Sequence, residues 1–580
     1  MAFTKLKRVA TALCLLSVSM TQAATTKLQD SVKEVVLDNG MTFLMVQQPG
    51  QPNIVGGWVA KVGSANEKPG ITGISHLFEH MLFKGSPRIG VKKAKLDDKI
   101  RGQLDDIRNQ MIEKERGYRE QVRLGYGASV TDAELQDDEM KALQKEFDAL
   151  IEKQRENLVK DEFDQVYTAA GASGMNAFTN QDMTVYFIRV PKNKLEMWMW
   201  MESERLSQPV FREFYSERDV VYEERRMRTE STPTGAQDEV FNSMFWRGHP
   251  YGWPVVGWPS DISAITREQA ANYFDQYYAP NNLTFALVGD FDEDEAIKMA
   301  KKYFGRIPSN GKKADDVITL GMPLLGDFNY ETEVDAPPSA TIQWRTTAFG
   351  GKDDPALSVL AGVLSGKTGR LYKRLVLEDQ IATSASAQSN TQKFDGSFSV
   401  AANGKKGISP KLLKKTLLEE VQKIIDEGIT DYELEKQLNQ SAAGQFRRLE
   451  DPFFLAIQLL YFEGLRDWRT MDTNFERLNK VTKADVQAVA EKYLTGFKAS
   501  ALYTRKVSDE PVDPELAALS QEDQDQVKQM LGQLAMVPPA QLPAIVARIE
   551  GSMAQAPADK QAAMQYLLKQ LKKRLDKAGE

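Results

Sequence analysis

The sequence has almost no cysteine and very little histidine. One cysteine, Cys14, and three histidines occur in a chain of 580 residues. Cys14 falls in an N-terminal stretch that we expect to be removed, so the mature chain would hold no cysteine at all. That excludes disulfides, a thiol nucleophile and a cysteine-ligated metal. In a chain this poor in histidine, two histidines at a metal-binding spacing are informative.

Two further absences narrow the class of protein. The formal net charge is -7 and no basic stretch is interleaved with aromatic residues, so we expect no nucleic-acid partner. No stretch of the mature chain is long and apolar enough to span a bilayer, so no membrane span is expected there. A chain of this length is too long for one core, and two or more domains are expected.

The N-terminus has the pattern of a secretory signal. Three basic residues among the first eight precede an apolar run from Val9 to Val18, and small residues follow. We expect cleavage after Ala23, which makes residues 1–23 a signal peptide. A membrane anchor is the weaker alternative, because a span needs about 20 apolar residues. The sequence therefore predicts a periplasmic or secreted protein.

The stretch from His76 to His80, His-Leu-Phe-Glu-His, has the features of a metal site. On a helix, its two histidines lie on one face about one turn apart, where both imidazoles can bind a tetrahedral metal. Glu79 lies on the same side, within reach of a water bound there. H-x-x-E-H is the inverted zincin signature. The alternative is a buried core helix whose histidines are merely hydrogen-bonded.

A second helical stretch offers the carboxylates that a two-histidine site still lacks. Glu217 and Glu224 are seven residues apart and so lie on nearly the same helical face. We expect Val220 and Val221 to bury that face and to turn the carboxylates inward. Glu223 competes as a ligand, but its spacing from Glu217 turns it about 100° off this face. Without the histidines, a solvated glutamate-rich face would be the simpler interpretation.

A highly charged segment, about residues 91–165, separates the two stretches. Two sets of apolar residues recur in it every three or four positions, on either side of the glycine-containing segment 125–129. This pattern predicts an antiparallel helical hairpin inserted into the first domain. We expect a structural or partner-docking role for the hairpin.

The second half of the chain looks like an eroded copy of the first. The apolar stretch from Leu357 to Gly366 parallels the helix that carries the histidines. At the positions of His76, Glu79 and His80 stand Leu357, Leu360 and Ala361. The repeat would keep the packing of the helix and lose its metal ligands.

Four motifs in one order resemble those of the inverted-zincin metallopeptidases. The motifs are His76-Leu-Phe-Glu79-His80, Asn176-Ala177-Phe-Thr179, the stretch from Glu217 to Glu224, and Gly248-His-Pro-Tyr-Gly252. This family includes pitrilysin, insulin-degrading enzyme and the mitochondrial processing peptidase, and the chain is similar to its short bacterial secreted type. The similarity runs from about residue 32 to residue 505.

The resemblance implies a zinc-dependent endopeptidase that hydrolyses peptides or small unfolded proteins. His76, His80 and Glu224 would bind one zinc ion per chain. Glu79 would be the general base for a zinc-bound water, and Glu217 would be a further carboxylate of the catalytic centre.

The resemblance also implies where the substrate binds. Asn176 and Ala177 would lie on an edge strand that pairs with an extended peptide. Relatives hold substrate with an arginine and a tyrosine of the second domain, but Val376 and Thr383 stand at those positions here. Three nearby candidates lie out of register, Arg370, Tyr372 and Arg374. We therefore expect the chain to be the zinc-bearing half of a homodimer, or of a heterodimer with a homologous chain.

The expected fold class is α+β. It comprises two homologous domains, each with a mostly antiparallel sheet covered by helices, plus the hairpin insertion and a helical C-terminal tail. The expected ranges are 24–309 for the zinc-bearing domain, 310–321 for a linker, 322–507 for the degenerate second peptidase-like domain and 508–580 for the tail. The insertion leaves 143 residues, 81 to 223, between His80 and Glu224, far more than in relatives. Such a length costs little, since loop-closure entropy grows logarithmically.

Two other functions stay open. One is a catalytically silent scaffold subunit of the same fold, which the intact H-x-x-E-H motif disfavours. The other is a peptide-binding module that keeps zinc for structural reasons. A peptidase assay with and without a chelator separates both from the enzyme.

Overall fold

The structure is a computed structural model that describes residues 28–506, 513–535, 537, 542–553 and 557–579. The chain divides into two compact units, Met1–Arg505 and Lys506–Glu580. The predicted signal peptide, residues 1–23, lies outside the described residues.

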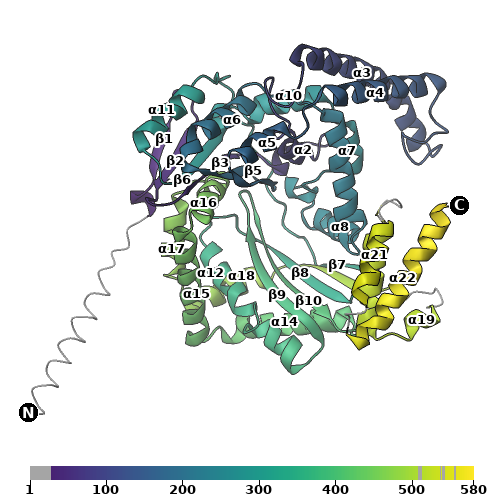
Figure 1. Ribbon diagram of the computed structural model, residues 1–580. Helices are drawn as coiled ribbons and strands as arrows, with labels where there is room; N and C mark the ends of the chain where they lie inside the picture. The colour runs from purple at the N-terminus through teal and green to yellow at the C-terminus, as the bar shows by residue number, and fades with distance from the viewer. Residues whose placement is uncertain (1–27, 507–512, 536, 538–541, 554–556, 580) are drawn as a thin grey trace, which may run out of the picture. The chain divides into compact units, whose positions relative to one another are not determined.

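The first half of the larger unit is built on a six-stranded sheet (Figure 1). The strands are β1 (Lys33–Val36), β2 (Thr42–Gln47), β3 (Asn53–Ala60), β4 (Ser173–Thr179), β5 (Thr184–Pro191) and β6 (Leu283–Gly289). Their order is β1-β2-β6-β3-β5-β4; β2 and β6 are parallel, and all other neighbours are antiparallel. Gly40 turns the β1–β2 hairpin at a φ of 91°, a backbone conformation that favours glycine.

Helices cover both faces of this sheet. On one face lies a core that includes Trp58, Phe78 and Trp198. On the other face Val55 and Val59 pack against α16 (Pro452–Leu465), which comes from the second half of the chain. Outside the insertion, the helices of the first half are α2 (Ile74–Met81), α6 (Leu195–Ser207), α7 (Phe214–Arg225), α8 (Gly235–Phe245), α9 (Pro259–Ala264), α10 (Arg267–Tyr277) and α11 (Glu293–Tyr303).

The second half repeats this architecture around a five-stranded sheet. Its strands are β7 (Phe328–Val334), β8 (Ser339–Thr346), β9 (Ala382–Thr391), β10 (Gly396–Gly404) and β11 (Ala499–Arg505). The order β7-β11-β8-β10-β9 has one parallel pair, β7 with β11, and reproduces the order and directions of β2-β6-β3-β5-β4. The predicted fold class, two related α+β domains with mostly antiparallel sheets, is confirmed.

The helices of the second half follow the same plan. They are α12 (Asp354–Leu364), α13 (Arg370–Tyr372), α14 (Pro410–Glu427), α15 (Asp431–Glu450), α16, α17 (Thr470–Leu478) and α18 (Lys483–Leu494). The helix α12 follows β8 and packs on the edge strand β9, as α2 follows β3 and packs on the edge strand β4. Residues 308–324, which contain the predicted linker, hold no helix or strand.

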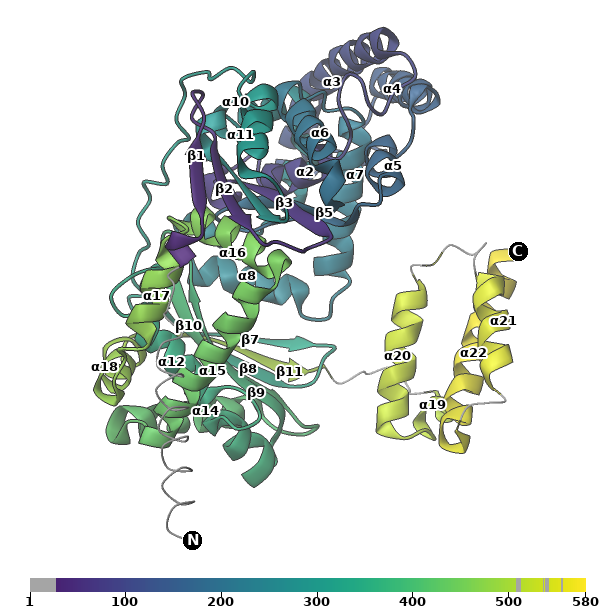
Figure 2. The ribbon, with the colours of Figure 1, turned by 60° about the vertical axis from the view of Figure 1, so that its left-hand side comes forward.

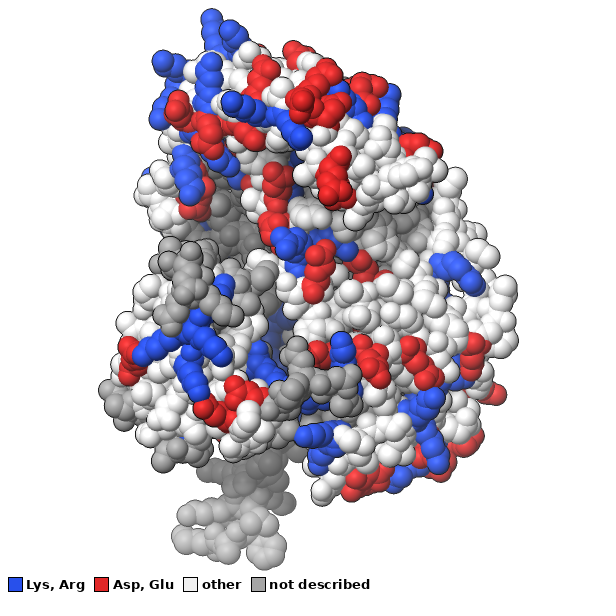
Figure 3. Space-filling view, turned by 90° about the vertical axis from the view of Figure 1, so that its right-hand side faces the viewer, with Lys and Arg blue, Asp and Glu red and all other residues white. Residues whose placement is uncertain are grey.

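The insertion forms the predicted helical hairpin. Its helices are α3 (Ala94–Arg123) and α4 (Asp138–Asn157), which pack side by side (Figure 2), and α5 (Glu162–Ala169) leads back to β4. The seam between the long helices includes Leu104, Met111, Met140 and Phe147, all of them buried. Acidic and basic side chains intermix on its surface, at the top of Figure 3. Neither sign of charge dominates there, so this surface offers no field for a strongly charged polymer.

The smaller unit is helical, as predicted for the tail. It contains α19 (Pro514–Ala517), α20 (Gln521–Ala535), α21 (Leu542–Met553) and α22 (Ala558–Gly579). Leu542, Leu567 and Leu571 are among the buried residues of its own small core. Throughout the described part of the chain, no helix combines the length and apolar character that crossing a bilayer requires.

Candidate metal centre

The helix α2, which carries both histidines of the motif, is fixed at its N-terminus by a buried glutamate. Glu67 accepts the backbone N–H groups of Gly73 and Ser75, each at 2.8 Å. These are donors that the first turn of a helix leaves without a partner. Burial raises the pKa of Glu67 to about 8. The two hydrogen bonds from the backbone act in the opposite direction and lower this pKa, but burial has the larger effect. Gly73 has a φ of 91°, and a Cβ there would lie 2.4 Å from the carbonyl oxygen of Val256, so only glycine fits.

Aromatic residues fix the buried side of α2. The hydroxyl of Tyr186 donates to the carbonyl of Phe78 at 3.0 Å, and the hydroxyls of Ser75 and Tyr273 lie 2.7 Å apart. The opposite side presents His76 and His80, whose ring centroids are 4.9 Å apart. The predicted one-turn spacing of the two imidazoles is what the structure shows.

Glu224, on α7, approaches both imidazoles. Its Oε2 atom lies 3.7 Å from His76 Nε2 and 3.3 Å from His80 Nε2. One donor atom from each of the three residues falls within 4.8 Å of the others. Ligand atoms bound to a tetrahedral zinc at about 2.0–2.1 Å lie about 3.3 Å from one another. The donor types and these separations fit zinc.

Neighbouring side chains orient the donor atoms. Glu217 Oε1 lies 2.9 Å from His80 Nδ1, which leaves Nε2 of that ring free to face Glu224. Lys84 Nζ contacts the other oxygen of Glu217 at 2.6 Å. Arg228 binds Oε1 of Glu224 at 2.6 Å, so Oε2 is the oxygen turned toward the histidines. Carboxylates that bind the outer nitrogen of a ligand histidine fix its tautomer and raise its basicity.

The two histidines have opposite pKa shifts. Burial, and next the nearby His80, lower the pKa of His76 to about 4. Burial also acts to lower the pKa of His80, but the hydrogen bonds with Glu217 and Glu224 raise it to about 9. Only a neutral imidazole binds a metal, so His80 must release a proton when one binds. The Nδ1 atom of His76 is buried and has no hydrogen-bond partner among the described residues.

Glu79 faces a cavity beside the histidines. Burial raises the pKa of its carboxyl group, and a hydrogen bond with Thr179 partly opposes that shift. The cavity measures about 450 Å³ and is also lined by His80, Asn176 and Ala177. A carboxylate with a raised pKa in such a place is suited to accept a proton.

Asn176 and Ala177 lie on β4, at the edge of the first sheet, where they face Phe187 and Tyr186 of β5. Asn176 is exposed and Ala177 is buried. The Ala177 N–H group donates to the side-chain oxygen of Asn176 at 2.9 Å. A peptide that paired with this N–H group would have to displace that side chain.

The competing ligand candidate, Glu223, points elsewhere. It is exposed, and its carboxylate binds Arg226 at 2.9 and 3.0 Å. Val221 is buried, but Val220 is 51% exposed, so the prediction that both valines bury the face of the carboxylates was wrong for Val220. Val220 lines a second cavity, about 1640 Å³, between α7 and the insertion.

The side chains at and near the two second-half positions where the family resemblance implies a substrate-binding arginine and tyrosine have other partners. Val376 packs against the core of that half, and the Thr383 hydroxyl donates to the carbonyl of Asn403. Arg370 is bound to Glu433 through two nitrogens, both at 2.7 Å. Arg374 pairs with Asp379 at 3.0 Å. The structure places none of these four side chains on the α2–α7 centre.

The sequence interpretation missed several residues around the centre. Arg228 follows Glu224 by four residues and Lys84 follows His80 by four, a spacing that could have pointed to both. Glu67 carried no such signal, and Thr179 was named as part of the Asn176–Thr179 motif but was given no role there. Directly after α7, which ends at Arg225, the chain continues as a π-helix, Arg226–Glu230, which spacing rules for α-helices do not predict.

Comparison with protein families agrees with this arrangement. The family model described as Insulinase (Peptidase family M16) matches residues 43–95, which include α2. The model described as Peptidase M16 inactive domain matches residues 264–441, which include α12. The two matches occur in the order of the two halves.

Two curated relatives match half of the chain or more. Zinc protease PqqE of Helicobacter pylori is 29% identical over 299 residues, which are 50% of this chain and 67% of that protein. Uncharacterized zinc protease YmxG of Bacillus subtilis is 22% identical over 483 residues, 81% of this chain and 98% of that protein.

Solved structures share the fold. A protease from Helicobacter pylori superposes with a TM-score of 0.67 at 23% identity, covering 82% of this chain and 99% of that chain. The periplasmic protease PqqL from Escherichia coli gives a TM-score of 0.59 at 15% identity, covering 84% of this chain and 49% of that chain. These structures show the shared fold, and the two family models with the relatives named zinc proteases show that the chain belongs to the M16 (insulinase) family of peptidases.

Proposed function

We propose that the protein is a zinc-dependent endopeptidase that hydrolyses peptides or small unfolded proteins. The observation that carries the proposal is the convergence of His76, His80 and Glu224 beside the carboxylate of Glu79. One zinc ion per chain would be held by the two Nε2 atoms and by Oε2 of Glu224. When bound, zinc would polarise a peptide carbonyl and lower the pKa of a water at the site.

The chain's own residues carry the proton transfers. Glu79 accepts a proton from the attacking water and then gives it to the amide nitrogen that leaves. Glu217 binds Nδ1 of His80 and so keeps Nε2 of that ring directed at the metal. These two roles need carboxylates in different settings, one beside the substrate cavity and one behind a ligand.

The substrate would bind as an extended strand. An exposed sheet edge binds peptides through main-chain hydrogen bonds, and β4 with Asn176 and Ala177 is the edge next to the centre. Rotation of the Asn176 side chain would free the Ala177 N–H group for such a bond.

The active form would pair this chain with a second M16 chain, as a homodimer or as a heterodimer. Val376 and Thr383 do not supply the arginine and tyrosine that the family resemblance expects, and Arg370 is already bound to Glu433. The chain matches 49% of PqqL and also matches the first half of that protein, which supports pairing of two such units. Turnover of this protein alone is compared with turnover after co-expression with a homologous chain. Full activity of the lone monomer would rule pairing out.

We place the protein in the periplasm or outside the cell. The signal pattern of residues 1–23 supports this location, and the similar PqqL is described as periplasmic. N-terminal sequencing of protein from cell fractions tests it, and a chain that still carries residues 1–23 would contradict it.

The peptidase activity is tested on the purified chain with a mixed peptide pool. We expect one zinc per chain by elemental analysis and hydrolysis that stops with a chelator and returns with zinc. Zinc without hydrolysis, alone or with a homologous partner, would favour a peptide-binding role. No zinc and no hydrolysis would favour a silent scaffold.

A further inference from the structure

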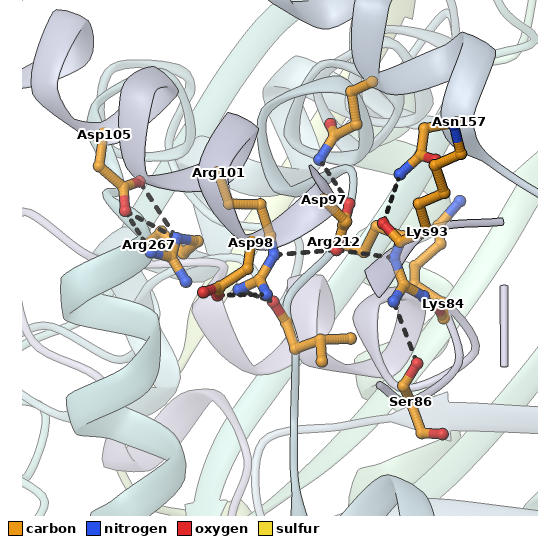
Figure 4. Close-up of polar contacts among 12 residues, drawn as sticks. Lys84, Ser86, Lys93, Asp97, Asp98, Arg101, Asp105, Asn157, Arg212 and Arg267 are labelled. Carbon is orange, nitrogen blue, oxygen red and sulfur yellow. Dashed lines mark hydrogen bonds and ion pairs between the residues drawn. The ribbon is translucent and has the colours of Figure 1, made fainter. Parts of the chain in front are cut away.

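Asp97 joins the insertion to the body of the first half. It lies in the first turn of α3 and is buried. Its carboxylate accepts from Arg101 Nε at 3.1 Å, from Arg212 Nε at 3.2 Å and from Gln154 Nε2 at 3.4 Å (Figure 4). Gln154 belongs to α4, and Arg212 precedes α7. Both long helices of the insertion and the chain entering α7 therefore meet at one carboxylate.

The guanidinium of Arg212 is enclosed by the loop that follows α2. It donates to the carbonyl oxygens of Lys84 at 3.0 Å, Ser86 at 3.0 Å and Ile89 at 2.8 Å. Gly90, at a φ of 94°, leaves the room that this requires, since a Cβ there would lie 2.8 Å from Nη1 of Arg212. The loop is thus held to one buried side chain by three hydrogen bonds.

The backbone on both sides of Arg212 is strained. Phe211 has a φ of 44° and Glu213 a φ of 57°. Among the described residues, only two other non-glycine positions have a positive φ. Such conformations persist where the surroundings over-determine them, and they gather at functional sites. Here they surround the residue that connects the insertion to the loop.

The loop leads directly to the metal centre. Lys84, whose carbonyl Arg212 binds, extends its Nζ atom to Oε2 of Glu217 at 2.6 Å. Glu217 in turn binds Nδ1 of His80 at 2.9 Å. A continuous series of contacts therefore runs from Asp97 to the imidazole of His80. Residues of the insertion also line the 450 Å³ and 1640 Å³ cavities, and His80 lines each of these two.

We propose that Asp97 is a positioning residue of the metal centre. It holds Arg212 in place, and Arg212 fixes the loop after α2. Lys84, which belongs to this loop, then fixes Glu217, and Glu217 fixes the imidazole of His80. The insertion is then part of the metal centre's support and is not only a docking surface. The inference rests on the proposed zinc site, so its first readout is metal affinity, measured without substrate.

A matched control exists on the same helix. Asp105 lies about two turns beyond Asp97, and its carboxylate likewise binds an arginine of the body, Arg267 (Figure 4). Asp105 also accepts from the hydroxyl of Tyr215, on α7, at 3.0 Å, but among the described residues none of its hydrogen bonds reaches the loop after α2. Asp97→Asn and Asp105→Asn therefore remove the same charge from the same helix, and only the first cuts the connection that runs through the loop after α2 to His80.

The test measures zinc affinity by competition with a chelator, followed by kcat and KM. Outer-shell substitutions typically cost about 10- to 100-fold in metal affinity or activity. For Asp97→Asn we expect a loss of about 10-fold in affinity and a lower kcat at unchanged KM. Asp105→Asn should keep wild-type affinity. Equal affinities in the two variants would overturn the inference.

A double-mutant cycle keeps the inference falsifiable if Asp97→Asn folds poorly. Arg212→Lys keeps the positive charge but cannot bind three carbonyls and a carboxylate at once, so it should also weaken zinc binding. Lys84→Met removes a later link of the same series. If the series is real, Arg212→Lys and Lys84→Met together lose no more affinity than the worse single variant. If the fold-losses in zinc affinity of the two single variants multiply in the double variant, the inference is overturned.

The two proposals fail in different ways. Wild-type protein that binds no zinc removes the proposed function and the inference with it. Wild-type protein that binds zinc, together with variants of Asp97 and Arg212 that bind it equally well, removes the inference alone.

Discussion

The helices α2 and α12 occupy the same place in two sheets of the same topology, yet of these two helices only α2 carries histidines that we propose as metal ligands. In α12 the corresponding residues are Leu357, Leu360 and Ala361, all buried in the core of the second half. In α2 the buried His76 keeps an Nδ1 atom that has no hydrogen-bond partner within the described part of the chain. Buried polar groups without partners cost stability, and buried leucines contribute to it.

The helices that pack against α2 and α12 differ in the same way. The helix α7 directs Glu217 and Glu224 at α2. The helix α15 packs on α12 and offers the amide of Gln437, which donates to the carbonyl of Gly362 at 2.9 Å. The scaffold is therefore complete with apolar residues at the ligand positions. Under the proposed function, the histidines and glutamates of the first half serve chemistry and not packing.

Of the substitutions that test this difference between the two halves, Glu224→Gln should have the largest effect on zinc content and hydrolysis. The amide is a poor metal ligand, so the first half would lose most of its zinc and all hydrolysis. Glu223→Gln is the matched control, because Glu223 is exposed and bound to Arg226. Elemental analysis of both variants decides. Zinc loss in Glu223→Gln alone would reassign the ligand.

Glu79→Gln should keep zinc and lose turnover. The amide has the size of the acid but cannot accept the proton, and general-base catalysis contributes about 10²–10⁴-fold. We expect kcat to fall by that factor at wild-type zinc content. Near wild-type turnover would remove Glu79 from the mechanism.

Glu217→Gln should give a smaller effect. It removes the negative charge that faces His80 and Lys84 but leaves all three proposed ligand atoms in place. We expect zinc affinity to fall about 10- to 100-fold, measured by chelator competition. An affinity equal to that of the wild type would show that the charge of Glu217 does not support zinc binding through His80.

Leu360→Ala sharpens the comparison from the other half, because Leu360 stands at the position that matches Glu79. Loss of this fully buried side chain should lower the free energy of unfolding by about 2–5 kcal/mol. Zinc content and kcat should stay as in the wild type. Thermal unfolding and the peptidase assay measure the two effects, and zinc loss would show that the halves are more tightly linked than these contacts imply.

Short-range spacing was sufficient to predict much of the fold and of the centre. His76 with His80, and Glu217 with Glu224, are helical spacings, and the structure brings His76, His80 and Glu224 together. The repeat of the sheet could be predicted because both halves keep similar sequence patterns.

Contacts between residues that are far apart in the sequence could not be predicted from short-range spacing. Arg212 and Asp97 are 115 residues apart, and no periodicity connects them. The exposure of Val220 could not be predicted either, because its spacing from Glu217 and Glu224 places it on the inner side of α7. There the insertion leaves a cavity and does not cover this side chain.

The third histidine, His249, is buried among packed aromatic side chains away from the metal centre. Its substitution should have the smallest effect of those considered, a change in how stability depends on pH. It lies beside Trp246 and Tyr251, in a cluster shared with the second sheet, and the charges that act on it are Asp395 and Arg345. Burial lowers its pKa to about 4 from 6.5. The folded protein therefore binds fewer protons than the unfolded chain between these values, and stability is lost as pH falls through that window.

At pH 5 this shift corresponds to about 2 kcal/mol of unfolding free energy. His249→Asn keeps an acceptor for the Tyr251 N–H group, which now donates to Nδ1 at 3.1 Å, but removes the titrating ring. We expect the thermal midpoint of the variant to fall less than that of the wild type between pH 7.5 and pH 5. Other titrating groups, Glu67 among them, act equally in both proteins and cancel in the difference. Identical pH dependence would mean that His249 keeps an ordinary pKa, and that burial between the halves costs this imidazole nothing.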